Sequence, residues 1–194
     1  MVIVLTDGAF DVESSRASIG AAVLDPEDGS YLYYSAVLEQ SATTELMKDS
    51  ANPICAIEVL AVLVAVLVWG RRLAGRPCLG FVDNEPAKFA LNRGSSAIVT
   101  VAALIDSVCT AEIAGRMLAW WERVPSASNL ADPPSRLELP PNLPGWPVPS
   151  RTLIDESSPA VLLGDLSVLK YATTSTHAFR ANAHRIVQGV RDAQ

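Results

Sequence analysis

The sequence has few residues of the kinds that build disulfide scaffolds or zinc sites. Its 194 residues include three cysteines and two histidines. Cys55, Cys78 and Cys109 are far apart in the sequence and form no Cys-x-x-Cys pair, which argues against a disulfide framework and against a zinc site. Such cysteines fit small buried side chains in a reducing compartment, which predicts an intracellular location, in the cytoplasm or the nucleus.

Positive charge is also scarce. The chain carries 15 Lys and Arg against 21 Asp and Glu, a formal net charge of -6. Proteins that coat nucleic acid by bulk attraction depend on many Lys and Arg side chains that neutralise phosphates, so this composition argues against that class. The argument is weaker if several of the acids are metal ligands, because bound cations reverse the local field.

Neither a membrane-spanning run nor a signal peptide is visible in the sequence. The most apolar run, Val59 to Trp69, has eleven residues, whereas a membrane span needs about 20. The N-terminal segment from Met1 leads straight into Asp7 with no basic leader. A first strand that begins at Met1 predicts a domain cut from a longer parent polypeptide.

Hydrophobic patterning predicts an α/β fold. Three apolar segments joined by short turns are typical of an antiparallel meander, and the alternation of helical and strand patterns after them is typical of β/α units. We therefore expect a mixed five-stranded sheet, an antiparallel meander followed by parallel strands, flanked by helices. The expected strands are residues 2–5, 18–24, 31–38, 78–82 and 117–124, and the expected helices are residues 53–73, 83–94 and 96–114 with a last one that begins at Asp132.

A change in composition after Arg136 predicts a domain boundary. Residues 137–149 contain five of the 13 prolines, which is typical of an extended linker. We therefore expect a catalytic domain at residues 1–136, and a Pro-rich linker and C-terminal tail at residues 137–194, with one terminal helix around residues 177–190. The histidines of this tail, His177 and His184, have no acidic partner at metal-ligand spacing and are expected at the surface.

Four acidic residues stand at positions that suggest a shared site. Singly, each has a plain structural explanation: Asp7 as a turn residue, Asp83 and Asp132 as helix N-caps, and Glu58 on an exposed stripe of its helix. Together they are more informative. Asp7 and Asp83 follow apolar strands whose ends meet at one edge of a sheet, and Glu58 and Asp132 can reach the same edge. Clustered carboxylates need cations, and oxygen ligands predict two Mg²⁺ or Mn²⁺ ions, which hydrolyse phosphodiesters when roughly 3.5–4 Å apart.

The surrounding residues resemble a known family. Thr6-Asp7-Gly8-Ala9, the mid-helix Glu58, Val82-Asp83-Asn84 and the run from Val124 to Arg136 look like the four motifs of type 1 ribonuclease H, in the same order. The last run and residues 90–96 are most similar to ribonuclease H domains of retroelement reverse transcriptases. The resemblance covers residues 1–136.

The resemblance implies a metal-dependent endonuclease that hydrolyses the RNA strand of RNA·DNA hybrids. It implies that Asp7, Glu58, Asp83 and Asp132 are catalytic metal ligands, with Asp7 bridging both ions. It also implies hybrid recognition through 2′-hydroxyls and the minor groove, with a reverse transcriptase domain of the parent polypeptide as a further partner. The candidates for substrate binding are Asn84, Arg93, Asn129 and Arg136.

Two features depart from the family pattern. The loop before Asp132 lacks the mobile histidine that many members carry there. The basic handle that some members use to grip hybrid is also absent, and the nearest substitutes are Arg71, Arg72 and Arg76, and Lys88 with Arg93.

Two other functions remain compatible with the sequence. The chain could be another nuclease or transferase of the same fold, such as an exonuclease, a resolvase or an integrase, although these differ in the last acid. It could also be a non-catalytic ribonuclease H-like connection module, which would be expected to lose acids that this chain retains.

Overall fold

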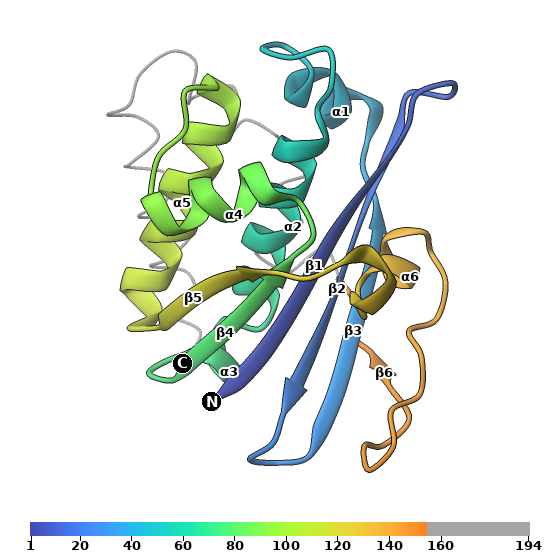
Figure 1. Ribbon diagram of the computed structural model, residues 1–194, viewed down its shortest axis with the longest axis vertical. Coiled ribbons are helices and arrows are strands. Elements are labelled where there is room, and N and C mark those ends of the chain that lie inside the picture. The colour runs from blue at the N-terminus through green and yellow to red at the C-terminus, as the bar shows by residue number, and fades with distance from the viewer. Residues whose placement is uncertain (155–194) are drawn as a thin grey trace.

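The computed structural model describes residues 1–154 and contains a six-stranded mixed sheet with helices on both faces (Figure 1). The strand order is β5-β4-β1-β2-β3-β6. The strands are β1 (Val2–Asp11), β2 (Arg16–Asp25), β3 (Ser30–Val37), β4 (Pro77–Val82), β5 (Leu118–Arg123) and β6 (Ser150–Arg151). The helices are α1 (Gln40–Leu46), α2 (Ile54–Val68), α3 (Gly70–Leu73), α4 (Glu85–Arg93), α5 (Val99–Gly115) and α6 (Asp132–Ser135), with a 3-10 turn at Ser126–Ser128.

The predicted α/β class and mixed sheet are confirmed. Strands β1, β2 and β3 form the antiparallel meander, and β4 and β5 add to it in parallel. The first strand is longer than the sequence predicted. The continuous apolar run ends at Leu5, but β1 stays paired with β2 as far as the pair Asp11 and Arg16. Asp7 therefore lies within β1, not after it.

The larger core lies between the sheet and α2, whose residues from Ala56 to Val66 are all buried. The predicted helix over residues 53–73 is divided, because α2 ends at Val68 and α3 begins at Gly70. Helix α1 was not predicted. Of the two neighbouring tryptophans on β5, Trp121 is buried and Trp120 is exposed, as the alternation of side chains along a strand requires.

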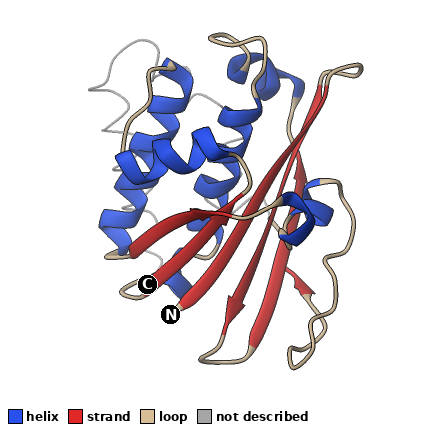
Figure 2. Ribbon diagram, in the orientation of Figure 1, coloured by secondary structure: helices blue, strands red, loops and turns tan. Residues whose placement is uncertain are grey.

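The opposite face of the sheet is covered by α6 and by the chain that follows it (Figure 2). Leu143 and Trp146 pack against a small cluster that contains Tyr31 and Tyr33. The Tyr31 hydroxyl donates to the Pro141 carbonyl at 3.1 Å. Strand β6 then pairs with Leu32 and Tyr33 of β3, which adds a sixth strand to the five that were predicted.

The Pro-rich segment is thus packed on the sheet as far as Ile154, which contacts the larger core. The division into residues 1–136 and 137–194 stays a prediction. The proposed terminal helix and both histidines lie outside the described residues. Within residues 1–154, no helix is long and apolar enough to cross a membrane.

We predict that a chain ending at Leu139 is less stable than a chain ending at Ile154. The shorter chain lacks β6 and exposes Tyr31 and Tyr33. Exposing these side chains costs about 2 kcal/mol or more, and each 1 kcal/mol moves the melting temperature of a domain of this size by roughly 2–4 °C, so we expect a difference of about 5 °C or more. Thermal melts of the two chains measure it. Equal melting temperatures would place the domain boundary at Arg136, as the composition suggested.

Candidate metal centre

The candidate site lies where β1 continues beyond its neighbour β4. The parallel pairing of these strands ends at Leu5 with Phe81, and β4 itself ends at Val82. Beyond that point β1 remains paired with β2, with Asp7 opposite Gly20. Asp7 therefore faces the opening between β1 and the end of β4, and Asp83 follows β4 at the same place.

Glu58 reaches this opening from α2 because β1 and α2 approach each other closely. A Cβ atom on Gly8 would lie 2.7 Å from the Ile57 Cγ2 atom and 3.1 Å from the Glu58 nitrogen, so only glycine fits there. The Gly8 backbone N–H lies on the side of the Glu58 carboxylate and opposes the rise of its pKa. The glycine of the Thr6-Asp7-Gly8 motif thus brings the helix carboxylate to the strand carboxylate.

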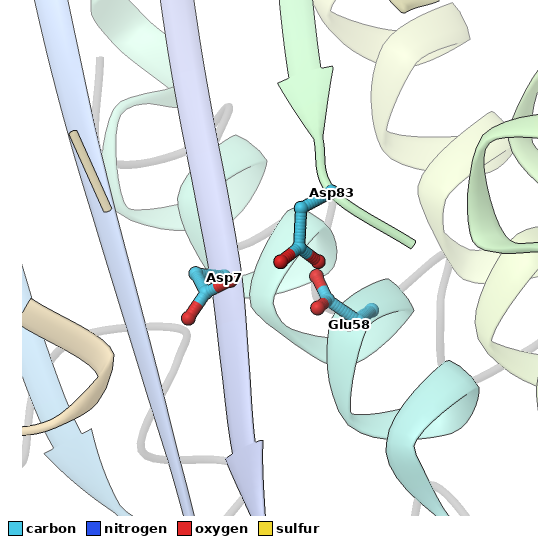
Figure 3. A group of neighbouring side chains, drawn as sticks. All are labelled: Asp7, Glu58 and Asp83. Carbon is cyan, nitrogen blue, oxygen red and sulfur yellow. The ribbon is translucent and has the colours of Figure 1, made fainter. Parts of the chain in front are cut away.

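Three of the four predicted acids come together. One carboxylate oxygen each from Asp7, Glu58 and Asp83 lies within 4.8 Å of the other two (Figure 3). Asp7 is 3 % exposed and Glu58 is 1 % exposed, while Asp83 is half-buried. The group is therefore largely removed from water but open on the Asp83 side.

Burial and mutual repulsion make these acids reluctant to ionise. Burial, a hydrogen bond with Asp83 and the charges of Asp7 and Asp83 raise the pKa of Glu58 to about 10. Burial, with added repulsion from Asp83 and Asp132, raises the pKa of Asp7 to about 7, although the Ser135 hydroxyl acts in the opposite direction. A cation among them would relieve both the desolvation and the repulsion.

The donor atoms fit a hard divalent cation. The Glu58 Oε2 atom is buried without a hydrogen-bond partner, an unfavourable state that a bound cation would end. All the available ligands are carboxylate oxygens, which Mg²⁺ and Mn²⁺ prefer, and the cluster contains no His or Cys. Asp7, Glu58 and Asp83 are the residues that could hold the ion.

The fourth predicted acid, Asp132, is near the other three but is paired differently. It is the first residue of α6, after an N-cap at Ala131, so the predicted N-cap role is wrong. The charge of Asp132 helps to raise the pKa of Asp7, yet the Asp132 carboxylate lies outside the group formed by Asp7, Glu58 and Asp83. Both of its oxygens accept from Arg136, at 3.0 and 3.2 Å.

The predicted substrate-binding residues occupy different kinds of position in the structure. Asn84 is the N-cap of α4, where its Oδ1 atom accepts from the Ala87 N–H at 2.9 Å, so Asp83 is not the cap and its carboxylate belongs to the acidic group. Arg93 is exposed in the last turn of α4. Asn129 is buried and donates to the Thr6 carbonyl at 3.0 Å, which makes direct contact with substrate incompatible with its position.

Two serines that the sequence did not single out contact the acids. The Ser126 hydroxyl donates to Asp83 Oδ2 at 2.6 Å, and the Ser135 hydroxyl donates to Asp7 Oδ2. Serines are common in loops and carry no spacing signal, so only the fold reveals these contacts.

Three of the five proposed basic substitutes for a substrate handle form ion pairs with acids outside the candidate site. Arg72 and Arg76 form ion pairs with Asp25, at 3.0 and 2.6 Å, near the end of β2. Lys88 pairs with Glu122 at 3.3 Å. Two of the three arginines after α2 therefore hold the sheet to the helix layer.

Comparison with known proteins finds similarity in structure but not in sequence. No protein-family model and no curated protein matches the chain. Among solved structures, LC11-RNase H1 in complex with an RNA/DNA hybrid matches with a TM-score of 0.55 and 16% identity over 71% of this chain and 96% of its own. LC11-RNase H1 was isolated from compost by a metagenomic approach.

Two further structures agree. RNase H1 of the halophilic archaeon Halobacterium salinarum gives a TM-score of 0.53 with 16% identity over 70% of this chain and 94% of its own. The N-terminal RNase H domain of rv2228c from Mycobacterium tuberculosis gives 0.51 with 15% identity over 70% and 90%. This chain has a ribonuclease H-like fold. At such low identity, the similarity establishes the fold alone.

We predict that Glu58→Gln flattens the pH dependence of stability in the metal-free protein. The folded protein holds the Glu58 proton up to about pH 10, whereas the unfolded chain releases it near 4.5. The folded state binds the extra proton, so stability falls as pH rises between these values, by up to about 1.4 kcal/mol per pH unit. Glutamine mimics the protonated acid and removes this dependence. Denaturant unfolding in EDTA across this pH range measures the slope.

Glu85→Gln is the matched control, because it makes the same change at an exposed position of α4. It should keep the slope of the parent. A Glu58→Gln protein with the parental slope would show that Glu58 is not buried as a protonated acid. The pKa of Asp7 is raised from 3.8 to about 7, so Asp7 adds a further fall in stability between these pH values in the parent and in both variants.

Proposed function

We propose that this chain is a metal-dependent endonuclease that hydrolyses the RNA strand of RNA·DNA hybrids. The observation that carries the proposal is the group formed by Asp7, Glu58 and Asp83, three carboxylates from β1, α2 and the end of β4 on a ribonuclease H-like fold. Two of the three are buried, and their pKa values are raised, which is a frequent property of functional sites.

Asp7, Glu58 and Asp83 would hold the metal, and Asp132 would join them if its ion pair with Arg136 opened. A divalent ion bound there lowers the pKa of water and stabilises charge on a phosphodiester. The side chains packed around Glu58 exclude water from that side of the site, whereas the half-buried Asp83 leaves the other side open to solvent. The family resemblance implies that Asp7 would be the residue that contacts both ions.

A cavity near the candidate site suggests where the substrate strand passes. It has a volume of about 200 Å³ and is lined by residues that include Ala9, Arg16 and Arg136. The register places Ala9 two residues beyond Asp7 on the same face of β1. Arg16 and Arg136 could contact phosphates of that strand, and the complex of LC11-RNase H1 with an RNA/DNA hybrid makes such a hybrid the first substrate to test.

The motif resemblance supports a retroelement reverse transcriptase as the parent polypeptide, and the three cysteines without a Cys-x-x-Cys pair support an intracellular location. A reverse transcriptase domain would supply the substrate grip that this acidic chain lacks. The rival nucleases of the same fold differ in substrate, and a connection module would not cut. Labelled RNA·DNA hybrid, duplex DNA and duplex RNA, each incubated with Mg²⁺, distinguish these three functions.

We predict that Asp7→Asn abolishes hybrid cleavage while the protein remains folded. The parent should cut the RNA strand with Mg²⁺ or Mn²⁺ and leave 3′-hydroxyl and 5′-phosphate ends. The neutral amide removes the central ligand, so the rate should fall by at least about 10³-fold. It also removes one of several crowded charges, so the melting temperature in EDTA should not fall.

Asp106→Asn makes the same change at an exposed position of α5 and should keep the parental rate. Undiminished cleavage in excess EDTA would exclude the metal mechanism. An Asp7→Asn protein that cuts as fast as Asp106→Asn would remove Asp7 from the site.

We predict that Arg16→Gln weakens hybrid binding and reduces its salt dependence. Each phosphate contact contributes about 0.9 to the slope of log affinity against log salt. Arg151→Gln, on β6 at the far edge of the sheet, should leave the slope unchanged. Fluorescence anisotropy over a salt series measures both. Equal slopes for the two variants would mean that the strand does not pass over the cavity.

A further inference from the structure

The carboxylate of Asp7 is bound on both oxygens by one short segment of the chain. Asp7 Oδ1 accepts from the Asn129 side-chain amide at 3.4 Å. Asp7 Oδ2 accepts from the Ser135 hydroxyl. The two donors are more than 120 residues away in sequence and lie on either side of Asp132.

Ser135 is held in place by the contact between α6 and β2. A Cβ atom on Gly20 would lie 2.2 Å from the Ser135 nitrogen, so α6 can pack there only against a glycine. The Ser18 hydroxyl also donates to the Ser135 carbonyl at 2.6 Å. Because Gly20 is the register partner of Asp7, this packing places the Ser135 side chain beside the carboxylate. Ser135 is fully buried.

Asn129 is fixed as firmly. Its amide nitrogen also donates to the Thr6 carbonyl at 3.0 Å, and its Oδ1 atom accepts from the Ala131 N–H at 3.1 Å. Both amide protons and the amide oxygen thus have protein partners. The side chain is buried and has no donor left for a substrate.

We propose that Ser135 and Asn129 are positioning residues that orient Asp7 for metal. This inference rests on the proposed function. An ionised carboxylate offers about four lone-pair sites, and the two donors occupy one on each oxygen. The remaining sites are then fixed relative to Glu58 and Asp83. Partners of this kind around a ligand typically change metal affinity by about 10–100-fold when they are removed.

The Ser135 hydroxyl could serve a different acceptor, since its oxygen is also 2.8 Å from the main-chain oxygen of Asp132. A hydroxyl has one proton, and a carboxylate is the stronger acceptor. If the Ser135 hydroxyl bonded only to the Asp132 carbonyl, it would stabilise α6 without affecting metal binding. The experiment therefore has to separate metal affinity from stability.

The test measures Mn²⁺ affinity of the full chain by calorimetry, without nucleic acid, together with the melting temperature in EDTA. Ser135→Ala removes the hydroxyl that contacts Asp7. Ser18→Ala is the matched control, because it removes a hydroxyl that holds α6 but does not contact the carboxylate. We expect Ser135→Ala to weaken Mn²⁺ binding by about tenfold or more. Ser18→Ala should stay within about twofold of the parent, even if its melting temperature falls as much.

Ser135→Thr keeps a hydroxyl at the same position and should bind Mn²⁺ more tightly than Ser135→Ala. Equal affinities of Ser135→Ala and Ser18→Ala would overturn the inference while leaving the proposed function intact. An affinity of Ser135→Thr no better than that of Ser135→Ala would also overturn it. A parent protein that does not bind Mn²⁺ would remove the metal site itself, and with it the proposed function.

Discussion

The site depends on one constraint, the concentration of acidic side chains in a place that excludes most water. Asp7 and Glu58 are buried together at the opening between β1 and the end of β4, and within residues 1–154 neither has an ion pair with Lys or Arg. Such an arrangement opposes folding unless protons or cations neutralise it. The glycines Gly8 and Gly20 impose it, since they allow α2 and α6 to close on β1 and β2.

At the opposite end of the sheet, another buried acid, Asp25, has a structural role. Asp25 is as buried as Glu58, but Arg72 and Arg76 both donate to its carboxylate and hold its pKa well below the usual range. That acid is fully compensated by protein groups. Glu58 has an oxygen without any partner and a raised pKa. The contrast within one chain favours a ligand, not a structural pair, at the Glu58 end.

Local pattern predicted most of the fold, and the errors arose where distant contacts decide the structure. Strands β2 to β5 and the helices from α2 to α5 follow from apolar periodicity and from the turns around Asp25 and Gly94. The full length of β1 depends on pairing with β2, which its own polar residues do not reveal. Strand β6 has two residues that follow the Pro-rich segment, and it forms by pairing with the edge of β3.

The acids of the site were predictable for a similar reason, and their supporting residues were not. An acid inside an apolar helix or at the end of an apolar strand is conspicuous, because it contradicts the pattern around it. Ser126 and Ser135 agree with their polar surroundings and give no such signal, and Asn129 was expected to bind substrate, not Asp7. Their contacts span from about 40 to more than 120 residues. The segment from residue 126 to residue 136 therefore contributes more than Asp132. Its side chains also donate hydrogen bonds that orient the carboxylates of Asp7 and Asp83.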